Sequence, residues 1–205
     1  MPENKYYSLW FSLAIFMIFV LQIIFPLITD FFKLTSSLAL IRPWTLFTSI
    51  FLHGSITHLL YNLFALALFG TILEHNIGSK RFLFVFFISG FFASIASVPF
   101  YNSVLGASGA IFGVIGSLTV LKPKMAIWVY GMPMPMFAAA FIWAVVDILG
   151  IFAPGNTANI AHLAGLFIGI VTAISIREKS PKETRENIKL NEDEVKEWEN
   201  KYLRR

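Results

Sequence analysis

Residues 106–111 read Gly106-Ala107-Ser108-Gly109-Ala110-Ile111 and lie inside a long apolar run. Glycines stand on both sides of a small hydroxyl there, and each glycine inside a helix costs about 1 kcal/mol relative to alanine. A helix that only faces lipid gains nothing from this composition. The stretch therefore predicts a helix that packs closely against its neighbours and presents one polar group inside a bundle.

The composition around this stretch is that of a membrane protein. Of the 205 residues, 57% are hydrophobic and 14% are charged, whereas soluble domains carry about 25% charged residues. Basic residues are not interleaved with aromatic ones, so the net charge of +4 does not predict a nucleic-acid partner. The absence of cysteine excludes a thiol nucleophile, a disulfide and a cysteine-ligated metal, and no cofactor is expected.

Six apolar segments predict six membrane-crossing helices, since a bilayer takes about 20 helical residues. The first segment lacks a small-residue cleavage site, so we expect it to be retained rather than removed as a signal peptide. Trp44 and the apolar residues around it predict an amphipathic first outer loop at the membrane interface. The predicted fold is an all-α polytopic six-helix bundle, with spans at residues 8–28, 55–73, 82–100, 105–121, 134–151 and 159–176.

Basic residues predict the orientation of these helices through the positive-inside rule. With the N-terminus inside, five basic residues lie in inner loops and nine in the tail, against Lys33 and Arg42 outside. Both termini are therefore predicted to be cytoplasmic. The protein itself is expected in the plasma membrane. Residues 1–176 would form the membrane domain and residues 177–205 a charged cytoplasmic tail. Asn191 and Glu194 resemble a helix start, so a short helix and a solvated tail both stay open there.

The predicted topology places polar residues of three helices at one depth. The second, fourth and sixth helices all enter from the outer face of the membrane. Near their starts they carry His58 with Asn62, Ser108, and His162, respectively. Segments that are far apart in the sequence thus converge on one layer, as a functional site requires.

Glycine patterns predict that the fourth and sixth helices touch. Gly165 and Gly169 share a helix face with His162 and form a GxxxG pattern, which allows two helices to approach closely. The fourth helix has a glycine stripe of its own, formed by Gly106, Gly109, Gly113 and Gly116. If the two faces meet, the imidazole lies against the start of the fourth helix, beside Ser108.

A serine beside a buried imidazole predicts acyl-transfer chemistry, although each residue alone also fits a structural role. The hydroxyl becomes nucleophilic when a base removes its proton, and a neutral imidazole can take that proton and later protonate the leaving amine. Asp147 is the one acid near the outer side of a predicted span. It can orient the ring as in a triad, but tight packing can also do so, and the Ser108–His162 dyad is the preferred hypothesis. His58 and Asn62 can donate to an oxyanion.

Other classes of membrane protein fit the sequence less well. A zinc protease would carry H-E-x-x-H and an aspartyl protease two facing aspartates, and the sequence has neither. A transporter would show a repeat or a polar path to the inner face, yet the inner halves of the predicted helices are almost wholly apolar. His53 is expected to belong to the interfacial connection. Glu74 is expected to cap a helix end or to pair with Arg81.

Three motifs in this order resemble the rhomboid family of intramembrane serine proteases: H-L-L-Y-N at residues 58–62, G-A-S-G at 106–109 and A-H-L-A-G-L-F-I-G at 161–169. The resemblance covers about residues 44–169. It implies that Ser108 is the nucleophile and His162 the general base, that Asn62, His58 and the Ser108 amide form the oxyanion hole, and that Phe112 packs on the His162 ring.

The resemblance also implies a substrate and a reaction. The substrates would be single-span membrane proteins, cleaved near the outer membrane surface by a Ser-His dyad without a metal or cofactor. The alternative is a catalytically inactive rhomboid-like membrane protein that serves in binding or quality control.

Overall fold

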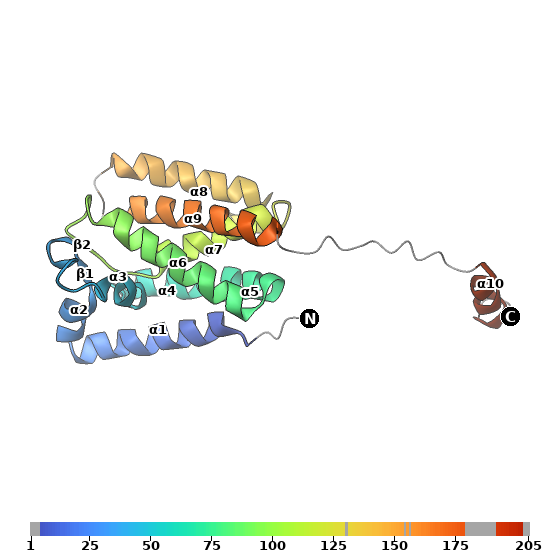
Figure 1. Ribbon diagram of the computed structural model, residues 1–205, viewed down its shortest axis with the longest axis horizontal. Coiled ribbons are helices and arrows are strands. Elements are labelled where there is room, and N and C mark those ends of the chain that lie inside the picture. The colour runs from blue at the N-terminus through green and yellow to red at the C-terminus, as the bar shows by residue number, and fades with distance from the viewer. Residues whose placement is uncertain (1–4, 130, 154, 156, 179–191, 203–205) are drawn as a thin grey trace.

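Six apolar helices form a bundle (Figure 1). The computed structural model describes residues 5–129, 131–153, 155, 157–178 and 192–202. One helix of the bundle is continuous through three elements: α4 (Ile56–Ala65), a π-helical stretch η3 (Leu66–Gly70) and α5 (Thr71–Ile77). The other five are α1 (Tyr7–Ile24), α6 (Ser79–Ser97), α7 (Ser108–Leu121), α8 (Met136–Ile151) and α9 (Asn159–Glu178).

Four of these helices are long and apolar enough to cross a membrane: Tyr7–Ile24, Ile56–Ile77, Ser79–Ser97 and Asn159–Arg177. The helices α7 and α8 are also apolar but have only 14 and 16 residues. At 1.5 Å per residue, α7 is about 21 Å long, less than the roughly 30 Å hydrocarbon core of a bilayer. The polytopic helical fold is confirmed, whereas six full spans stay a prediction.

The sequence predicted a single helix for the first apolar run, but the structure shows two helices there. Its helix α1 ends at Ile24, and a second short helix, α2 (Leu27–Phe32), begins directly after Pro26. Phe25 has φ −127° and ψ 83°, outside the helical region. Proline causes this break, because its ring disfavours a helical conformation in the residue before it and it has no N–H to donate.

The connection after α2 is a chain of short elements. It contains η1 (Ser36–Leu38), α3 (Thr45–Thr48) and η2 (Ser49–Phe51), and the apolar side chains of Leu40 and Ile41 are 97% and 71% exposed. Strand β1 (Leu34–Thr35) pairs antiparallel with β2 (Ser103–Val104), with Leu34 opposite Val104. This pairing fixes the connection to the segment that leads into α7.

A β-hairpin that the sequence did not predict precedes α8. Strand β3 (Ala126–Val129) pairs antiparallel with β4 (Met132–Pro135), and Gly131 in the turn has φ +80°. The fifth apolar helix therefore begins at Met136, two residues later than predicted, because residues 134 and 135 belong to β4. The two small sheets are additions to an otherwise helical fold.

Helix α7 is the centre of the bundle and packs against α6, α8, α9 and η3. A Cβ added to Gly165 would lie 2.0 Å from the Gly109 carbonyl oxygen, and one on Gly169 would lie 1.9 Å from that of Gly113. The two backbones are thus in direct contact, and the predicted meeting of the glycine faces is confirmed. Gly106 does not share in it, because it lies before α7 and faces His58 instead.

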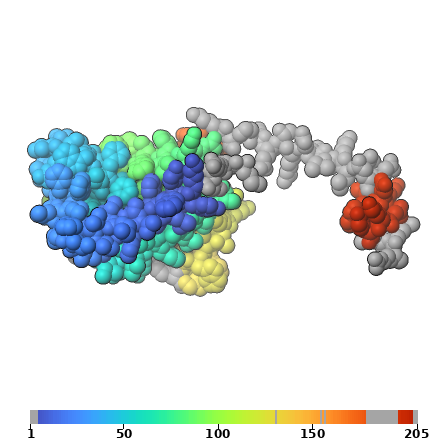
Figure 2. Space-filling model, turned by 90° about the horizontal axis from the view of Figure 1, so that it is seen from below, coloured from blue at the N-terminus to red at the C-terminus, as the bar shows by residue number. Residues whose placement is uncertain are grey.

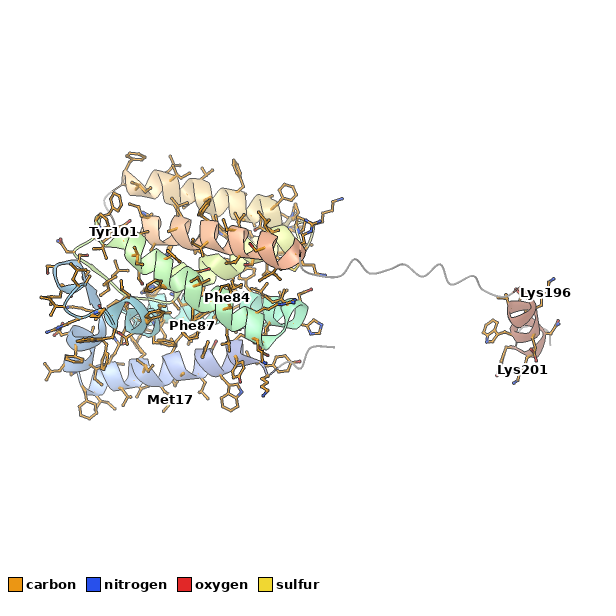
Figure 3. All side chains as sticks on the ribbon, viewed as in Figure 1. Met17, Phe84, Phe87, Tyr101, Lys196 and Lys201 are labelled. Carbon is orange, nitrogen blue, oxygen red and sulfur yellow. The ribbon has the colours of Figure 1, made fainter. Side chains whose placement is uncertain are left out.

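Large apolar side chains cover the outside of the bundle. Met17 on α1, for example, is 53% exposed and points away from the other helices (Figure 3), and α1 lies along the surface of the bundle (Figure 2). Exposed apolar surface of this extent fits a lipid environment.

In the tail, α10 (Glu192–Tyr202) is a short helix in which the Trp198 and Tyr202 rings are 5.6 Å apart. Asn191, its predicted start, lies outside the described residues.

Candidate active site

Ser108 is the first residue of α7, and the turn before it is built from glycine. Gly106 has φ +128°, a conformation that side chains rarely tolerate, and its N–H donates to the Ser49 carbonyl at 2.9 Å. A Cβ on Gly106 would lie 2.7 Å from the His58 ring. The glycine thus permits both the turn and the close approach of an imidazole. The Ser108 N–H is one of the first amides of the helix, which have no partner inside it.

His162 lies in the first turn of α9 and faces Ser108. Its Nε2 lies 2.8 Å from the Ser108 hydroxyl oxygen, within hydrogen-bond distance. The Phe112 ring, one turn along α7, stacks on the imidazole with a centroid distance of 4.3 Å and an interplanar angle of 7°. The side chain of His162 is only 13% exposed. Direct contact between the α7 and α9 backbones brings these three side chains together.

Asp147 contacts the other side of the same ring. It lies on α8, and its Oδ1 is 3.0 Å from His162 Nδ1. The Asp147 side chain is 7% exposed, and its Oδ2 is buried with no hydrogen-bond partner. The sequence left open whether a carboxylate or packing alone holds the ring, and the structure places this carboxylate against it.

Beside an ionised Asp147, the two hydrogen bonds of a neutral His162 ring allow only one tautomer. An ionised carboxylate only accepts hydrogen bonds, so Nδ1 carries the proton and donates it to Asp147. The Nε2 atom is then unprotonated and free to accept from Ser108. A hydroxyl that donates to an unprotonated imidazole nitrogen is the arrangement in which a serine can be activated.

His58 and Asn62 lie one turn apart on α4, next to this site. The Ser55 hydroxyl caps α4 by accepting from the His58 N–H at 3.2 Å, and the His58 ring lies against Gly106, two residues before Ser108. Asn62 is buried, and its Nδ2 donates to the His58 carbonyl at 2.8 Å. This bond uses one of the two amide hydrogens, so the second is available to another acceptor.

His53 extends the site toward α1. Its ring is 2% exposed and meets the His58 ring edge to face at a centroid distance of 4.9 Å. Burial, followed by the proximity of His58, lowers the pKa of His53 to about 3, so the ring is neutral at physiological pH. The predicted place of His53 in the connection before α4 is correct, but the sequence did not indicate that it is buried.

Gln22 on α1 holds the backbone of His53, a contact that the sequence did not predict. The His53 N–H donates to Gln22 Oε1 at 3.0 Å, and Gln22 Nε2 donates to the His53 carbonyl at 3.2 Å. A polar side chain in an apolar helix is costly and is retained where it has a partner. Gln22 is the only amide side chain in α1. Its polarity was the one feature of the sequence that indicated a buried partner for this helix.

Glu74 lies at the opposite end of the bundle from Ser108. It is fully buried and accepts hydrogen bonds from the backbone N–H groups of Tyr7 and Ser8, at 2.9 and 3.0 Å, and from the Ser79 hydroxyl at 2.6 Å. Of the two roles predicted for Glu74, the structure thus shows a helix cap rather than a pair with Arg81. The helix that it caps is α1, which the sequence did not indicate.

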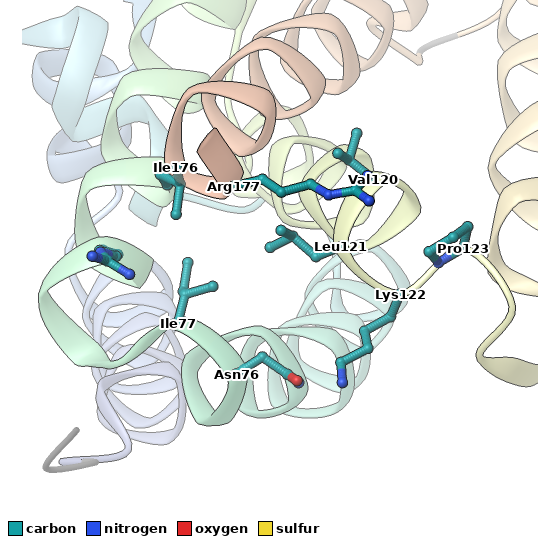
Figure 4. Close-up of a pocket in the computed structure, with 9 residues that line it drawn as sticks. Asn76, Ile77, Val120, Leu121, Lys122, Pro123, Ile176 and Arg177 are labelled. Carbon is teal, nitrogen blue, oxygen red and sulfur yellow. The ribbon is translucent and has the colours of Figure 1, made fainter. Parts of the chain in front are cut away.

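A cavity of about 310 Å³ also lies at this opposite end (Figure 4). Lys122 and Arg177 are among its lining residues, and they follow or end α7 and α9, whereas Ser108 and His162 begin these helices. None of the candidate residues lines the cavity, so it is separate from the site. The full lining consists of Asn76, Ile77, Arg81, Val120, Leu121, Lys122, Pro123, Ile176 and Arg177.

The amino-acid sequence of this chain is similar to those of known proteins. A family model described as Rhomboid domain matches residues 41–179. The chain is 38% identical over 139 residues to the rhomboid protease GluP of Bacillus subtilis and 33% identical over 130 residues to RHOMBOID-like protein 6, mitochondrial, of Arabidopsis thaliana. It is 29% identical over 140 residues to the rhomboid protease GlpG of Pectobacterium atrosepticum.

These alignments cover most of this chain but less than half of each relative. They include 65%, 62% and 65% of the chain, against 26%, 42% and 48% of GluP, RHOMBOID-like protein 6 and GlpG. The matched residues contain Ser108, Asp147 and His162 together with α4. The similarity therefore covers the helices that carry the candidate site.

Proposed function

The chain belongs to the rhomboid family, and on this premise we propose that it is an intramembrane serine endopeptidase, with Ser108 as its nucleophile and His162 as its general base. It is an integral membrane protein. The observation that carries the proposal is the 2.8 Å hydrogen bond from the Ser108 hydroxyl to His162 Nε2 at the contact of α7 and α9. A hydroxyl chosen only for close helix packing would not need an imidazole acceptor.

The first half of the reaction forms an acyl-enzyme. Ser108 Oγ attacks the carbonyl carbon of the scissile peptide bond while its proton passes to His162 Nε2. The tetrahedral intermediate then collapses and breaks the C–N bond, and His162 Nε2 gives this proton to the leaving amine. The carboxyl-side fragment departs with a free amino group, and the other fragment stays esterified to Ser108.

The second half restores the enzyme with water. His162 Nε2 takes a proton from the attacking water, whose oxygen adds to the ester carbonyl. Collapse of the second tetrahedral intermediate expels Ser108 Oγ, which recovers the proton from Nε2. One peptide bond and one water molecule are consumed, and the hydroxyl and the neutral imidazole are restored.

The negative oxygen of each intermediate needs hydrogen-bond donors, and three groups are candidates for this role. The Ser108 N–H lies at the N-terminus of α7, where the helix dipole favours negative charge. Asn62 retains one free amide hydrogen, and the His58 ring lies beside Gly106 at the start of this turn. We assign these groups to the oxyanion hole, where loss of one donor typically costs about 10²–10³-fold in rate.

The proposed substrates are single-span membrane proteins, cleaved near the outer surface of the plasma membrane. His58, Ser108 and His162 lie in the first turns of α4, α7 and α9, and Asn62 lies one turn further along α4. These three helices enter from the outer side if both termini are cytoplasmic. The distribution of basic residues supports that orientation. Residues 1–176 would then form the protease domain and residues 177–205 a cytoplasmic tail.

Cleavage of a generic single-span substrate by the purified full chain in liposomes tests the proposal. Ser108→Ala and His162→Ala should each lower the rate by roughly 10⁴-fold or more. Ser117→Ala is the matched control, because Ser117 is also buried on α7 and also bonds to α9, through the Gly169 carbonyl at 2.8 Å. It should retain nearly full activity. Cleavage that survives Ser108→Ala would show that Ser108 is not the nucleophile.

Labelling with a serine-reactive fluorophosphonate separates this function from the alternative of an inactive binding protein. An activated Ser108 should react covalently in the wild type and in Ser117→Ala, but not in Ser108→Ala. A binding protein whose serine is not activated would show no labelling and no cleavage in any form.

A further inference from the structure

We propose that Asp147 is a positioning residue of this active site, which orients the His162 ring of the Ser108–His162 dyad and stabilises its protonated form. The role rests on the proposed function, because Asp147 would act through the general base. The carboxylate comes from α8, the hydroxyl from α7 and the imidazole from α9. Three helices therefore meet at one ring.

The distances match those of a working hydrogen-bond chain. Asp147 Oδ1 lies 3.0 Å from Nδ1 of His162, and Nε2 of the same ring lies 2.8 Å from Ser108 Oγ. Both values fall in the range of good hydrogen bonds. The ring thus uses both nitrogens at once, each in the role that acyl transfer requires.

Packing alone does not orient this ring. The Phe112 ring lies parallel to the imidazole, within 7°, and so fixes the plane in which His162 lies. A half-turn about the Cβ–Cγ bond keeps that plane but moves Nε2 away from Ser108 and Nδ1 away from Asp147. Stacking hardly distinguishes these two orientations, whereas the Asp147 hydrogen bond is made in only one of them. The carboxylate therefore selects the productive orientation.

The surroundings of Asp147 argue against a purely structural role. Its side chain is 7% exposed, its Oδ2 has no hydrogen-bond partner, and its chain neighbours Val146 and Ile148 are exposed apolar residues. Burying a carboxylate with one partner costs more than burying an apolar side chain of similar volume. Ionisable residues that persist at such positions in membrane proteins are typically functional.

Asp147 also stabilises the positive charge that develops on His162 in the transition state. When His162 Nε2 takes the proton of Ser108, a positive imidazolium forms on a side chain that is only 13% exposed. The negative charge of Asp147 at 3.0 Å stabilises that cation, while the Nδ1 proton stays on the ring. Without Asp147, the ring can also adopt the tautomer with the proton on Nε2, which cannot accept from Ser108.

Kinetics of Asp147→Asn in the full chain in liposomes test the proposal. We expect kcat to fall on the order of 10²–10⁴-fold, with KM changed by less than about threefold and with the melting temperature unchanged or raised. Asp147→Glu should recover part of the loss, because it restores the charge. The matched control is Asp30→Asn, the same change at an exposed acid that pairs with Lys33 at 2.7 Å, and it should retain full kcat.

A double-mutant comparison separates positioning from packing. Because Asp147 acts through His162, Asp147→Asn should slow fluorophosphonate labelling in the wild-type background and cause no further loss in the His162→Ala background. An equal loss in both backgrounds would overturn the proposal. So would wild-type kcat in Asp147→Asn, or recovery of activity by Asp147→Leu, which fills the space without a charge and serves if Asp147→Asn folds poorly.

These outcomes are distinct from a failure of the proposed function. If the wild type cleaves and Ser108→Ala does not, the protease assignment holds whatever Asp147→Asn does. If Ser108→Ala cleaves as well as the wild type, the protease assignment itself fails, and with it the role of Asp147.

Discussion

Two buried carboxylates, at opposite ends of the bundle, are bonded in different ways. Glu74 is fully buried, and both of its oxygens accept hydrogen bonds, from two backbone amides of α1 and from Ser79. Asp147 is also buried, and one of its oxygens contacts His162 while the other has no partner. The contrast is between a carboxylate with hydrogen-bond partners on both oxygens and one with a partner on a single oxygen.

This difference in hydrogen bonding indicates that the Glu74 end of the bundle serves stability and the Asp147 end serves catalysis. A buried polar group with all its hydrogen bonds made rigidifies the structure around it. A buried group that leaves an oxygen unpaired lowers stability, and it is retained where its one partner performs chemistry. We therefore expect changes at Glu74 to affect folding and changes at Asp147 to affect catalysis.

The largest effect on stability is expected from Glu74→Ala. The Tyr7 and Ser8 amides and the Ser79 hydroxyl would lose their acceptor, at a cost of roughly 3–5 kcal/mol in the free energy of unfolding. Reversible unfolding in mixed detergent micelles measures this loss, and the folded fraction should keep its kcat. Glu74→Gln retains one carbonyl acceptor and should lose less. Wild-type stability in Glu74→Ala would contradict the contrast.

The next largest effect is expected from Gly106→Ala, which disturbs the Ser108 end without replacing a polar side chain. The new Cβ would combine a strained φ of +128° with a 2.7 Å contact to the His58 ring, at a cost of about 2–3 kcal/mol. Fluorophosphonate labelling should slow as well. Gly131→Ala is the matched control, because Gly131 also has a positive φ, +80°, but no atom near its missing Cβ.

A smaller effect of opposite sign is expected from Asp147→Leu. Replacing a half-satisfied carboxylate with an apolar side chain should leave the free energy of unfolding unchanged or raise it by about 1 kcal/mol, while cleavage is lost. Unfolding and cleavage measured on the same preparation test this. A loss of stability as large as that of Glu74→Ala would show that Asp147 is a structural anchor as well.

The smallest effect concerns pH and His53. Its pKa is about 3 in the folded protein, against 6.5 as the ordinary value, so only the unfolded chain binds a proton there between these values. Stability should therefore decrease as pH falls below 6.5, by about 1 kcal/mol between pH 6.5 and 5.5. Melting temperatures of the wild type and His53→Gln compare this directly. Equal pH dependence in both would show that His53 binds protons equally in the folded and unfolded states, and would contradict the lowered pKa.

The sequence predicted the contact of α7 with α9 but not the contact of α8 with α9. Glycines at helical spacing mark the faces of α7 and α9 by themselves, since residues three and four apart share one side of a helix. Helix α8 has apolar residues all round except Asp147, so its pattern does not show which face turns inward. For the same reason the sequence left the role of Asp147 open.

Local properties of the chain therefore determined the membrane class, the apolar helices and the polar residues near their starts, because hydropathy and helical period act over a few residues. The tertiary structure decided which partner each buried polar group meets: Glu74 with the start of α1, Gln22 with His53, and Asp147 with His162. These pairs depend on rotations and shifts of whole helices by a few ångströms. Only the combined packing of all neighbours fixes such shifts.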